Sequence, residues 1–246
     1  MAPERSRPRK RLLVIAIDGP AGSGKSTIAK GVARALKLRR LDTGAMYRAL
    51  TLRAVRDGIE PDDARALAAL ARRTRFSYSD SEIRVNGKPV GQAIRRPEVS
   101  RVVSKVAAHP GVRRELVKRQ REIIGKGGVV VEGRDIGTVV VPKADLKVFL
   151  TASPGERARR RHRELTDAGV RVSLPKLRKE QARRDRLDST RSVSPLVAAK
   201  DAVKIDSTGK TPRQTVAEVV RLVRDKDPRE PRPARRRRPR AGVRKR

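Results

Sequence analysis

The stretch LLVIAIDGPAGSGKST, residues 12–27, predicts a β-strand, a glycine-rich loop and the start of an α-helix. Its first six residues are apolar and are followed by Asp-Gly-Pro, as expected of a buried parallel strand that runs into a loop. Residues 19–26 then match the pattern G-x-x-x-x-G-K-[ST], and the helix should begin within 24–27 and continue through Leu36. This order of strand, loop and helix is the context in which the pattern binds a nucleoside triphosphate, and it argues against a chance glycine-rich turn.

The loop predicts a nucleotide site and a ligand for magnesium. Its glycines allow successive backbone N–H groups to point at phosphate oxygens, and the helix N-terminus adds partial positive charge. Lys25 is expected to contact the β- and γ-phosphates, and the Ser26 hydroxyl to coordinate Mg²⁺. The expected nucleotide-binding residues are Gly19, Pro20, Ala21, Gly22, Ser23, Gly24, Lys25, Ser26 and Thr27.

The rest of the body alternates strands with helices. Short apolar runs predict buried strands at 128–131 and 146–150, with a weaker candidate at 202–205. Helical spacing is found at 97–124 (broken by Pro110), at 154–168, at 173–188, and after Thr211-Pro212, where Val216, Val219, Val220 and Val223 form one apolar stripe. The alternation predicts an α/β fold whose parallel sheet is covered by helices on both faces.

One segment departs from this alternation. Residues 76–90 contain two short stretches with period-two patterning and the dipeptide Asn86-Gly87, a strong signal for a hairpin turn. We therefore expect a small antiparallel insertion, placed at about 74–95.

Composition excludes several classes of protein. The 246 residues contain no Cys and two His, which excludes disulfides and thiol catalysis and leaves little for a zinc site. No apolar run approaches the roughly 18 residues of a membrane span, and the N-terminus lacks the features of a secretory signal. We therefore expect a cytoplasmic protein without membrane contact, and we expect it to be a monomer.

The formal charge of +36 is concentrated partly at the two ends. Residues 1–11 carry a net +4 and residues 226–246 a net +9, which leaves +23 for the body between them. The C-terminal stretch has almost nothing apolar to bury, so we expect a disordered tail. Such a tail could be a solvated arm or a non-specific nucleic-acid contact, although four aromatic residues in the whole chain argue against base stacking.

Arginines and hydroxyls follow the predicted strands at places where anionic groups would converge. The segment 41–48 places Thr43, Tyr47 and Arg48 after a probable second strand, and 133–137 places Arg134 and Asp135 after the strand at 128–131. Ligands of open α/β sheets bind at this carboxyl edge. Helical spacing joins three more arginines into one cationic face, namely Arg157, Arg160 and Arg161. Each feature alone could be a cap or a solvated surface; together they favour an enzyme that shields two nucleotides from water.

The runs IDGPAGSGKS, LDTGAMYR, EGRDIGTVV and ARRDRLDSTR together closely resemble bacterial cytidylate kinases. The resemblance spans about residues 12–225. It implies a P-loop nucleoside monophosphate kinase with a helical lid at about 154–172, which uses ATP and Mg²⁺ to phosphorylate CMP or dCMP. The alternatives are a kinase for another small acceptor, such as UMP or AMP, and a nucleic-acid-associated P-loop ATPase.

The resemblance also implies roles on the acceptor side. Thr43, Tyr47 and Arg48 would line the monophosphate site, with Arg48 on the acceptor phosphate. Arg134 and Asp135 would contact that phosphate and the sugar.

Base recognition and closure are implied for residues further along the chain. Ser104, Arg113 and Asp188 would recognise cytosine, and the site would be closed by Arg184, Asp188 and Arg191. Leu187 and Ser189 stand where more polar residues can occur in the family, which leaves the fine contacts of this segment open.

The expected chemistry is alignment and charge neutralisation, because the acceptor phosphate is already a competent nucleophile. The residues expected to act on the transferred phosphoryl group are Lys25, Arg134, Arg157 and Arg161. Asp135 is the candidate if a general base assists.

Overall fold

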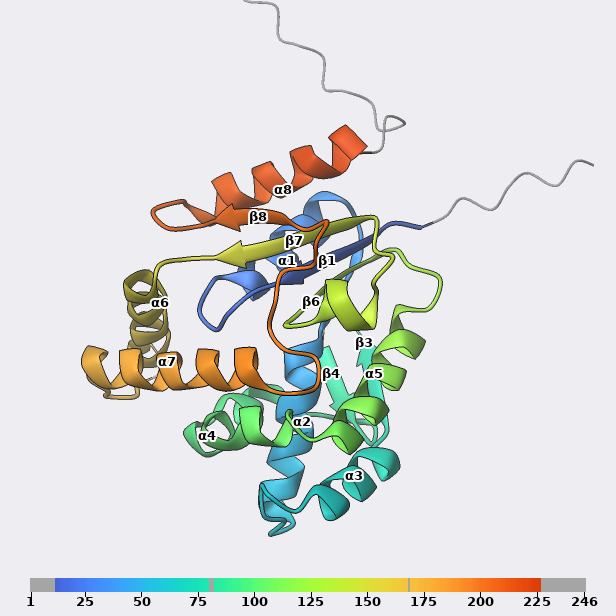
Figure 1. The fold of residues 1–246 in the computed structure, drawn as a ribbon, viewed down its shortest axis with the longest axis vertical. Helices are drawn as coiled ribbons and strands as arrows, with labels where there is room; N and C mark the ends of the chain where they lie inside the picture. The colour runs from blue at the N-terminus through green and yellow to red at the C-terminus, as the bar shows by residue number, and fades with distance from the viewer. Residues whose placement is uncertain (1–11, 80–81, 168, 227–246) are drawn as a thin grey trace, which may run out of the picture.

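A five-stranded parallel sheet forms the centre of the molecule, which is described by a computed structural model over residues 12–79, 82–167 and 169–226 (Figure 1). The strand order is β2-β6-β1-β7-β8. The strands are β1 (Val14–Asp18), β2 (Arg39–Asp42), β6 (Val129–Gly133), β7 (Leu146–Thr151) and β8 (Val203–Asp206). Every predicted strand is therefore confirmed, whereas the predicted arms at 1–11 and beyond Lys226 lie outside the described residues.

Helices α1 (Lys25–Ala35) and α8 (Pro212–Lys226) cover one face of the sheet. Ile15 and Ile17 of β1 point into this layer and meet Val32 of α1 and Val219 of α8 in one buried cluster. The expected valine stripe of α8 faces this cluster, and the Thr211 hydroxyl accepts the N–H of Gln214 at 3.3 Å as a helix cap. The predicted start of this last helix is thus confirmed.

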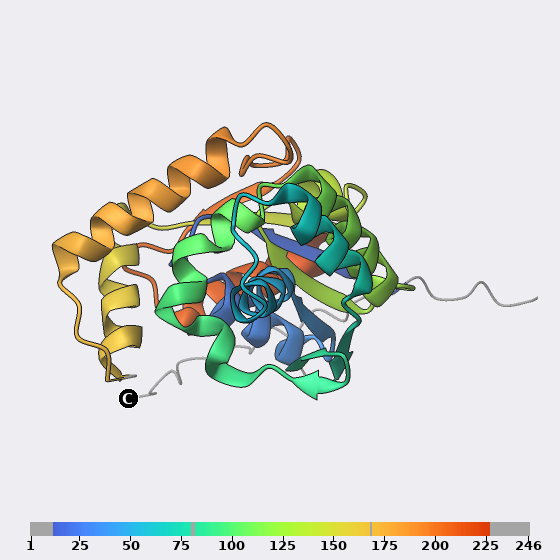
Figure 2. The same cartoon turned by 90° about the horizontal axis from the view of Figure 1, so that it is seen from below.

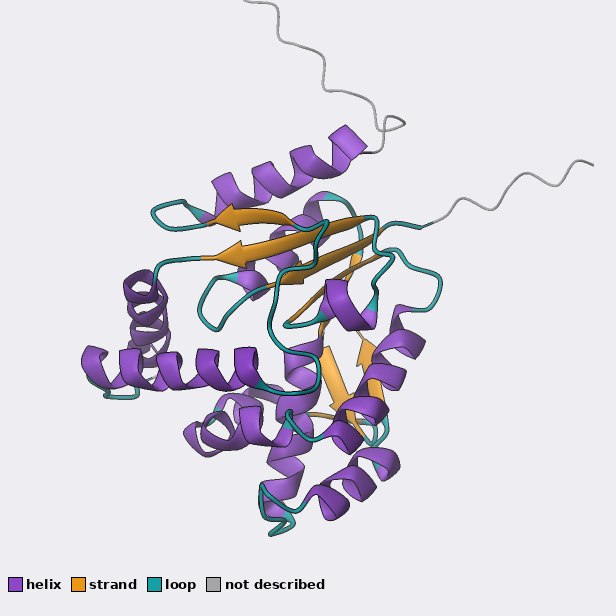
Figure 3. Ribbon diagram, in the orientation of Figure 1, coloured by secondary structure: helices purple, strands orange, loops and turns teal. Residues whose placement is uncertain are grey.

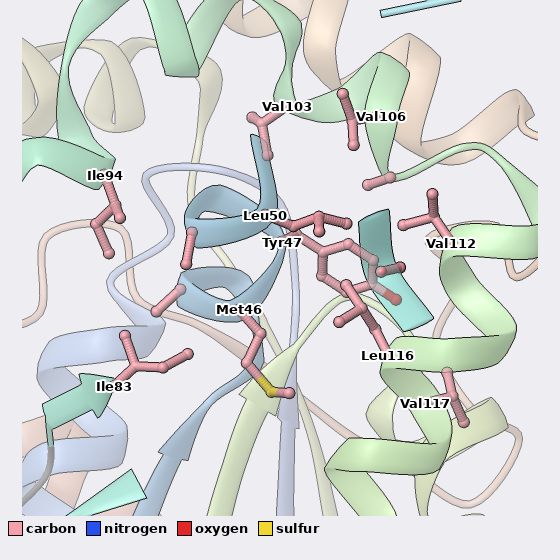
Figure 4. Close-up of a cluster of buried hydrophobic side chains, with 14 of the residues drawn as sticks. Met46, Tyr47, Leu50, Ile83, Ile94, Val103, Val106, Val112, Leu116 and Val117 are labelled. Atoms are coloured by element: carbon pink, nitrogen blue, oxygen red, sulfur yellow. The ribbon is translucent and has the colours of Figure 1, made fainter. Parts of the chain in front are cut away.

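The opposite face carries a larger helical layer built around α2 (Thr43–Arg56). Figure 4 shows Met46, Tyr47 and Leu50 of α2 surrounded by apolar side chains of the neighbouring elements. The labelled side chains come from β4 (Glu82–Val85), η1 (Gly91–Arg95), α4 (Pro97–Val106) and α5 (Pro110–Ile124). Helix α3 (Ala64–Arg73) and the short π-helix η2 (Ile136–Val140) contribute to the same cluster. The break at Pro110 is confirmed, while α3 and η2 were not predicted.

Two further helices pack against each other along one side of the domain (Figure 2). They are α6 (Pro154–Asp167), which follows β7, and α7 (Leu174–Thr190). Helix α6 covers most of the segment predicted to be a lid.

The insertion is a three-stranded antiparallel sheet, set apart from the main sheet in Figure 3. Its strands are β3 (Phe76–Ser79), β4 (Glu82–Val85) and β5 (Lys88–Pro89). Asn86 and Gly87 join β4 to β5 with φ of 51° and 79°, the left-handed values that a type I′ turn requires. The predicted turn is confirmed. Strand β3, which precedes β4 in the chain, also pairs with β4 and adds a third strand to this sheet.

Because the main strands are parallel, the carboxyl ends of β1, β2, β6 and β7 lie at one edge of the sheet. The phosphate loop follows β1, helix α2 follows β2, Arg134 follows β6, and α6 follows β7. The fold thus places these four predicted site segments at one edge. Within the described ranges, no helix combines the length and the apolar character needed to cross a bilayer.

Close packing of α1 on α8 generates a stability prediction. A Cβ at Gly31 would lie 2.5 Å from Cγ2 of Val216, so alanine at position 31 should cost about 1–3 kcal/mol despite its better helix propensity. In a Val216→Ala background the obstruction is gone, and Gly31→Ala should then be neutral or stabilising. Urea unfolding of the two single variants and the double variant measures this coupling. Additive effects would show that α1 and α8 do not meet at these residues.

Candidate active site

The phosphate loop adopts a conformation that needs its glycines. Gly22 and Gly24 have φ of 75° and 91°, and a Cβ at Gly19 would lie 2.0 Å from the carbonyl oxygen of Leu150. Gly24 is also the N-cap of α1, which leaves the first N–H groups of the helix at the loop. This arrangement is suited to bind phosphate oxygens.

Lys25 lies inside the loop. Its ammonium donates to the carbonyl of Pro20 at 2.7 Å and lies 3.4 Å from Oγ of Ser23. Burial, and next the positive charge of Arg134, hold the pKa of Lys25 well below its usual range. A bound polyphosphate would stabilise its charged form. Of the other predicted loop residues, Thr27 is exposed on the first turn of α1.

Ser26 meets a carboxylate for which the sequence analysis assigned no role. Its hydroxyl donates to Oε2 of Glu132 at 2.6 Å, and Oε1 of Glu132 accepts from Arg40 at 3.0 Å. Glu132 is 2% exposed, and burial raises its pKa to about 7. A hydroxyl and a carboxylate beside a phosphate loop form the oxygen-rich set that Mg²⁺ prefers, so these residues fit that ion. In the described part of the chain, this place included, no group of three or more His, Cys, Asp or Glu side chains is arranged to hold a metal.

The positive charges of several arginines act on Arg48, which the sequence predicts to bind the acceptor phosphate. Burial lowers the pKa of Arg48 to about 9, and further contributions come from the positive charges of Arg184, Arg161, Arg95 and Arg134. Arg48 donates to two neutral groups, the carbonyl of Ile94 at 3.1 Å and the hydroxyl of Ser100 at 2.9 Å. The repulsion within this arginine cluster (Arg48, Arg95, Arg134, Arg161 and Arg184) would be relieved by an anion.

Two carboxylate–guanidinium pairs lie beside the cluster. Asp135 pairs with Arg113 through one oxygen and has Arg191 at 3.7 Å from the other. Asp188 accepts from Nε of Arg134 at 2.9 Å. Arg113 and Asp188, which are both expected to recognise cytosine, thus have different partners in this structure.

Helix α6 directs the three arginines of the predicted cationic face to different places. Arg157 donates to the carbonyl of Ala21 at 3.1 Å and pairs with Asp185 of α7 at 2.6 Å. Arg160 donates to the carbonyl of Ser23 at 3.2 Å, whereas Arg161 contributes to the arginine cluster. Two of the three arginines of the predicted cationic face therefore contact the phosphate loop.

The remaining predicted residues are buried supports of this site. Thr43 donates from its hydroxyl to the carbonyl of Glu132 at 2.7 Å, and the guanidinium carbon of Arg113 lies 5.5 Å from the centre of the Tyr47 ring. Tyr47 itself is part of the buried cluster in Figure 4, and Ser104 is buried on α4. The Tyr47 ring thus packs on the guanidinium that pairs with Asp135.

Sequence reasoning missed Glu132 and Asp18, which are both buried carboxylates at strand ends. Asp18 accepts the backbone N–H groups of Ile136 and Gly137, each at 2.8 Å. An acidic residue as the last or next-to-last residue of a strand that enters a predicted site was the available signal. It would have found both residues.

The raised pKa of Glu132 generates a pH prediction. The unfolded chain loses this proton near pH 4.5 and the folded chain only near 7, so the unfolded state holds fewer protons between these values. The free energy of unfolding should therefore fall as the pH rises from about 4.5 to 7. Glu132→Gln should remove on the order of 2 kcal/mol of this fall, measured by urea unfolding without nucleotide or magnesium.

Glu122→Gln is the matched control, because Glu122 is an exposed carboxylate that pairs with Arg119 on α5. The free energy of unfolding of this variant, plotted against pH, should run parallel to that of the unaltered protein. If the Glu132→Gln curve does so too, the Glu132 carboxyl is ionised throughout this pH range.

Comparison with known proteins agrees with this geometry. The family model for cytidylate kinase matches residues 15–225. The cytidylate kinase of Desulfitobacterium hafniense (strain Y51) is 50% identical over 220 residues, which cover 88% of this chain and 95% of that protein. The bifunctional pantoate ligase/cytidylate kinase of Synechococcus sp. (strain JA-3-3Ab) is 53% identical over 223 residues, so this chain spans only 41% of that longer relative.

Among solved structures, an uncharacterized protein from Eubacterium ventriosum ATCC 27560 shares the fold. Its TM-score is 0.50 at 10% identity, over 87% of this chain and 98% of that one. The match of the family model and the relative matched over nearly its whole length place this chain in the cytidylate kinase family.

Proposed function

We propose that this protein transfers the γ-phosphoryl group of ATP to the phosphate of CMP or dCMP, giving ADP and CDP or dCDP. The observation that carries the proposal is the arginine cluster, held beside a phosphate loop at one edge of the sheet. Five guanidinium groups held near one another suit a substrate that brings several negative charges.

The reaction requires little covalent work from the protein. An oxygen of the acceptor phosphate attacks the γ-phosphorus, and the bond from that phosphorus to the bridging oxygen of ADP breaks. Lys25 and the loop N–H groups would hold the donor phosphates, while Arg48 and Arg134 would hold the acceptor phosphate in line. Asp135 has a guanidinium beside each of its oxygens, so we assign it to binding and not to proton transfer.

Magnesium would be held by Ser26, with Glu132 beside it. When bound, the ion neutralises charge on the oxygens of the transferred phosphoryl group and its leaving group. The Thr43 hydroxyl, by donating to the carbonyl of Glu132, fixes the strand end from which that carboxylate projects.

The lid at about 154–172 would exclude water from the transfer. Arg157 connects α6 to the phosphate loop and to Asp185, so lid position and loop position are linked. Arg161 would then complete the positive charge around the moving phosphoryl group. Shielding matters because water would otherwise compete with the acceptor for ATP.

The two carboxylate–guanidinium pairs suggest a division of labour between base and phosphate. Arg134, the partner of Asp188, also donates to the carbonyl of Gly19, which places that pair beside the phosphate loop. Arg113 instead donates to the carbonyl of Ala107 and packs on the Tyr47 ring, in the helical layer. Since the base lies at the end of the nucleotide away from the phosphate, Asp135 and Arg113 are better placed to recognise cytosine, with Ser104 nearby on α4.

Removal of the loop lysine tests the donor site. Lys25→Ala deletes a charge that is used mostly in the transition state, so turnover should fall by at least ~10²-fold. Lys30→Ala is the matched control, because Lys30 is exposed on the same helix. A coupled assay of ADP release measures both variants. Near-normal turnover of Lys25→Ala would overturn the donor-site assignment.

Base selectivity tests the acceptor site. Cytosine offers an amino donor and a ring acceptor, which a carboxylate and a guanidinium recognise; uracil reverses both groups. An amide at position 135 can also donate to the uracil O4, so Asp135→Asn should narrow the CMP-to-UMP ratio of kcat/KM by about 10-fold.

Asp188→Asn is the comparison variant and should lower kcat/KM for both nucleotides alike. If the ratio narrows with Asp188→Asn and not with Asp135→Asn, Asp188 is the residue that recognises the base.

A further inference from the structure

The carboxylate of Asp18 binds the chain at the point where the acceptor-side residues leave the sheet. Asp18 is the last residue of β1 and is 5% exposed. Its Oδ1 accepts the N–H of Ile136 and its Oδ2 the N–H of Gly137, both at 2.8 Å. These amides open the π-helix η2, directly after Arg134 and Asp135.

The next residue, Gly19, contacts the same turn from the other side. Its carbonyl accepts from the guanidinium of Arg134 at 3.0 Å. The dipeptide Asp18-Gly19 therefore holds the turn 134–137 twice, once through two backbone N–H groups and once through a side chain. Gly19 is also the first residue of the phosphate loop, so the donor and acceptor halves share this contact.

The turn has little room to adopt another position. A Cβ at Gly133 would lie 2.6 Å from Oγ1 of Thr43 and 2.6 Å from Cδ1 of Ile136. A Cβ at Gly137 would lie 3.1 Å from Cδ of Lys147 and 3.4 Å from Oδ2 of Asp18. The turn is closely packed, and both of its buried N–H groups donate to the Asp18 carboxylate.

Keeping this carboxylate buried has an energetic cost. The pKa of Asp18 is raised to about 6, mainly by burial and to a smaller extent by the neighbouring Asp135, against the lowering effect of the two N–H groups and of the positive charge of Lys25. Asparagine has the same shape but offers one acceptor, so its NH₂ would face a backbone N–H. The carboxylate is therefore the side chain that satisfies both donors in this space.

We propose that Asp18 is a positioning residue for the acceptor site: its carboxylate fixes the turn that carries Arg134 and Asp135 relative to the phosphate loop. The inference rests on the proposed function, which assigns these two residues to CMP. This role differs from that of the phosphate-loop residues that follow Asp18 in the chain, because Asp18 acts on the acceptor site through the backbone N–H groups of residues 136 and 137.

Asp145 provides a matched control, because it binds the opposite end of β1. Its Oδ2 accepts the N–H of Val14 at 2.8 Å, so it too is a carboxylate bound to a backbone amide of the sheet. It lies at the start of β7, away from the carboxyl edge. Asp145→Asn therefore makes the same chemical change where no acceptor contact is expected.

The experiment measures KM for CMP, kcat and the dissociation constant of ATP for the full-length protein and its Asp18→Asn and Asp145→Asn variants. For Asp18→Asn, kcat/KM for CMP should fall at least ~10-fold, since a small misplacement of positioning groups is costly, while ATP affinity changes less than ~3-fold. Asp145→Asn should leave both quantities within ~2-fold, whatever its melting temperature. Equal losses for CMP and ATP, or unchanged CMP kinetics, in Asp18→Asn would overturn the proposal.

A second variant covers the case in which Asp18→Asn does not fold. Gly137→Ala crowds the same contact, because its methyl group would lie 3.1 Å from Cδ of Lys147 and 3.4 Å from Oδ2 of Asp18, which accepts the N–H of residue 137. It should raise KM for CMP at constant ATP affinity, and unchanged CMP kinetics would contradict the proposal. The unaltered protein in the same assay tests the proposed function separately: if it phosphorylates another acceptor and not CMP, the function is wrong, and the variants still test positioning with that acceptor.

Discussion

Positive charge held away from water at the carboxyl edge of the sheet is the constraint on which the rest of the site depends. Arg48 is held near Arg184, Arg161, Arg95 and Arg134, and its pKa falls to about 9 largely because it is buried. A folded chain tolerates such a cluster when the surrounding packing is strong and a ligand of opposite charge is the natural partner. The packing comes from the α2 layer, whose buried side chains in Figure 4 fix the helix that carries Arg48.

Buried carboxylates balance this positive charge, and each one ties two elements together. Asp135 joins η2 to α5, Asp188 joins α7 to the turn after β6, and Glu132 joins β6 to the phosphate loop through Ser26. Breaking one such pair leaves a buried charge without its partner, which is costly. The phosphate loop, the turn after β6 and the helices α5 and α7 are therefore connected by charge as well as by the backbone.

Much of this could be predicted from the sequence, because local patterns determined it. The apolar run at 12–17 with the glycine loop behind it predicted β1 and α1, and Asn86-Gly87 predicted the turn that requires two left-handed residues. Helix α3 was missed although Asp63 caps it and Leu67, Leu70 and Ala71 lie at helical spacing on its buried side. The local signals for this helix, its cap and its helical spacing, were therefore present in the sequence.

Which charged side chains pair with each other could not be predicted in the same way. Arg113 and Asp188 are 75 positions apart, and nothing local indicates that Arg113 pairs with Asp135 and Asp188 with Arg134. The π-helix η2 likewise depends on Asp18, more than a hundred residues earlier. Such contacts are set by which strand ends meet at the sheet edge, and that is a property of the whole fold.

The most direct test of the account is a panel of acceptors with the unaltered protein. Initial rates of ADP release with ATP, Mg²⁺ and each of CMP, dCMP, UMP and AMP compare the four nucleotides under one set of conditions. The account predicts that CMP or dCMP has the highest kcat/KM and exceeds UMP and AMP by at least ~10-fold. Equal efficiency with UMP or AMP, or ADP release that needs no acceptor, would contradict it.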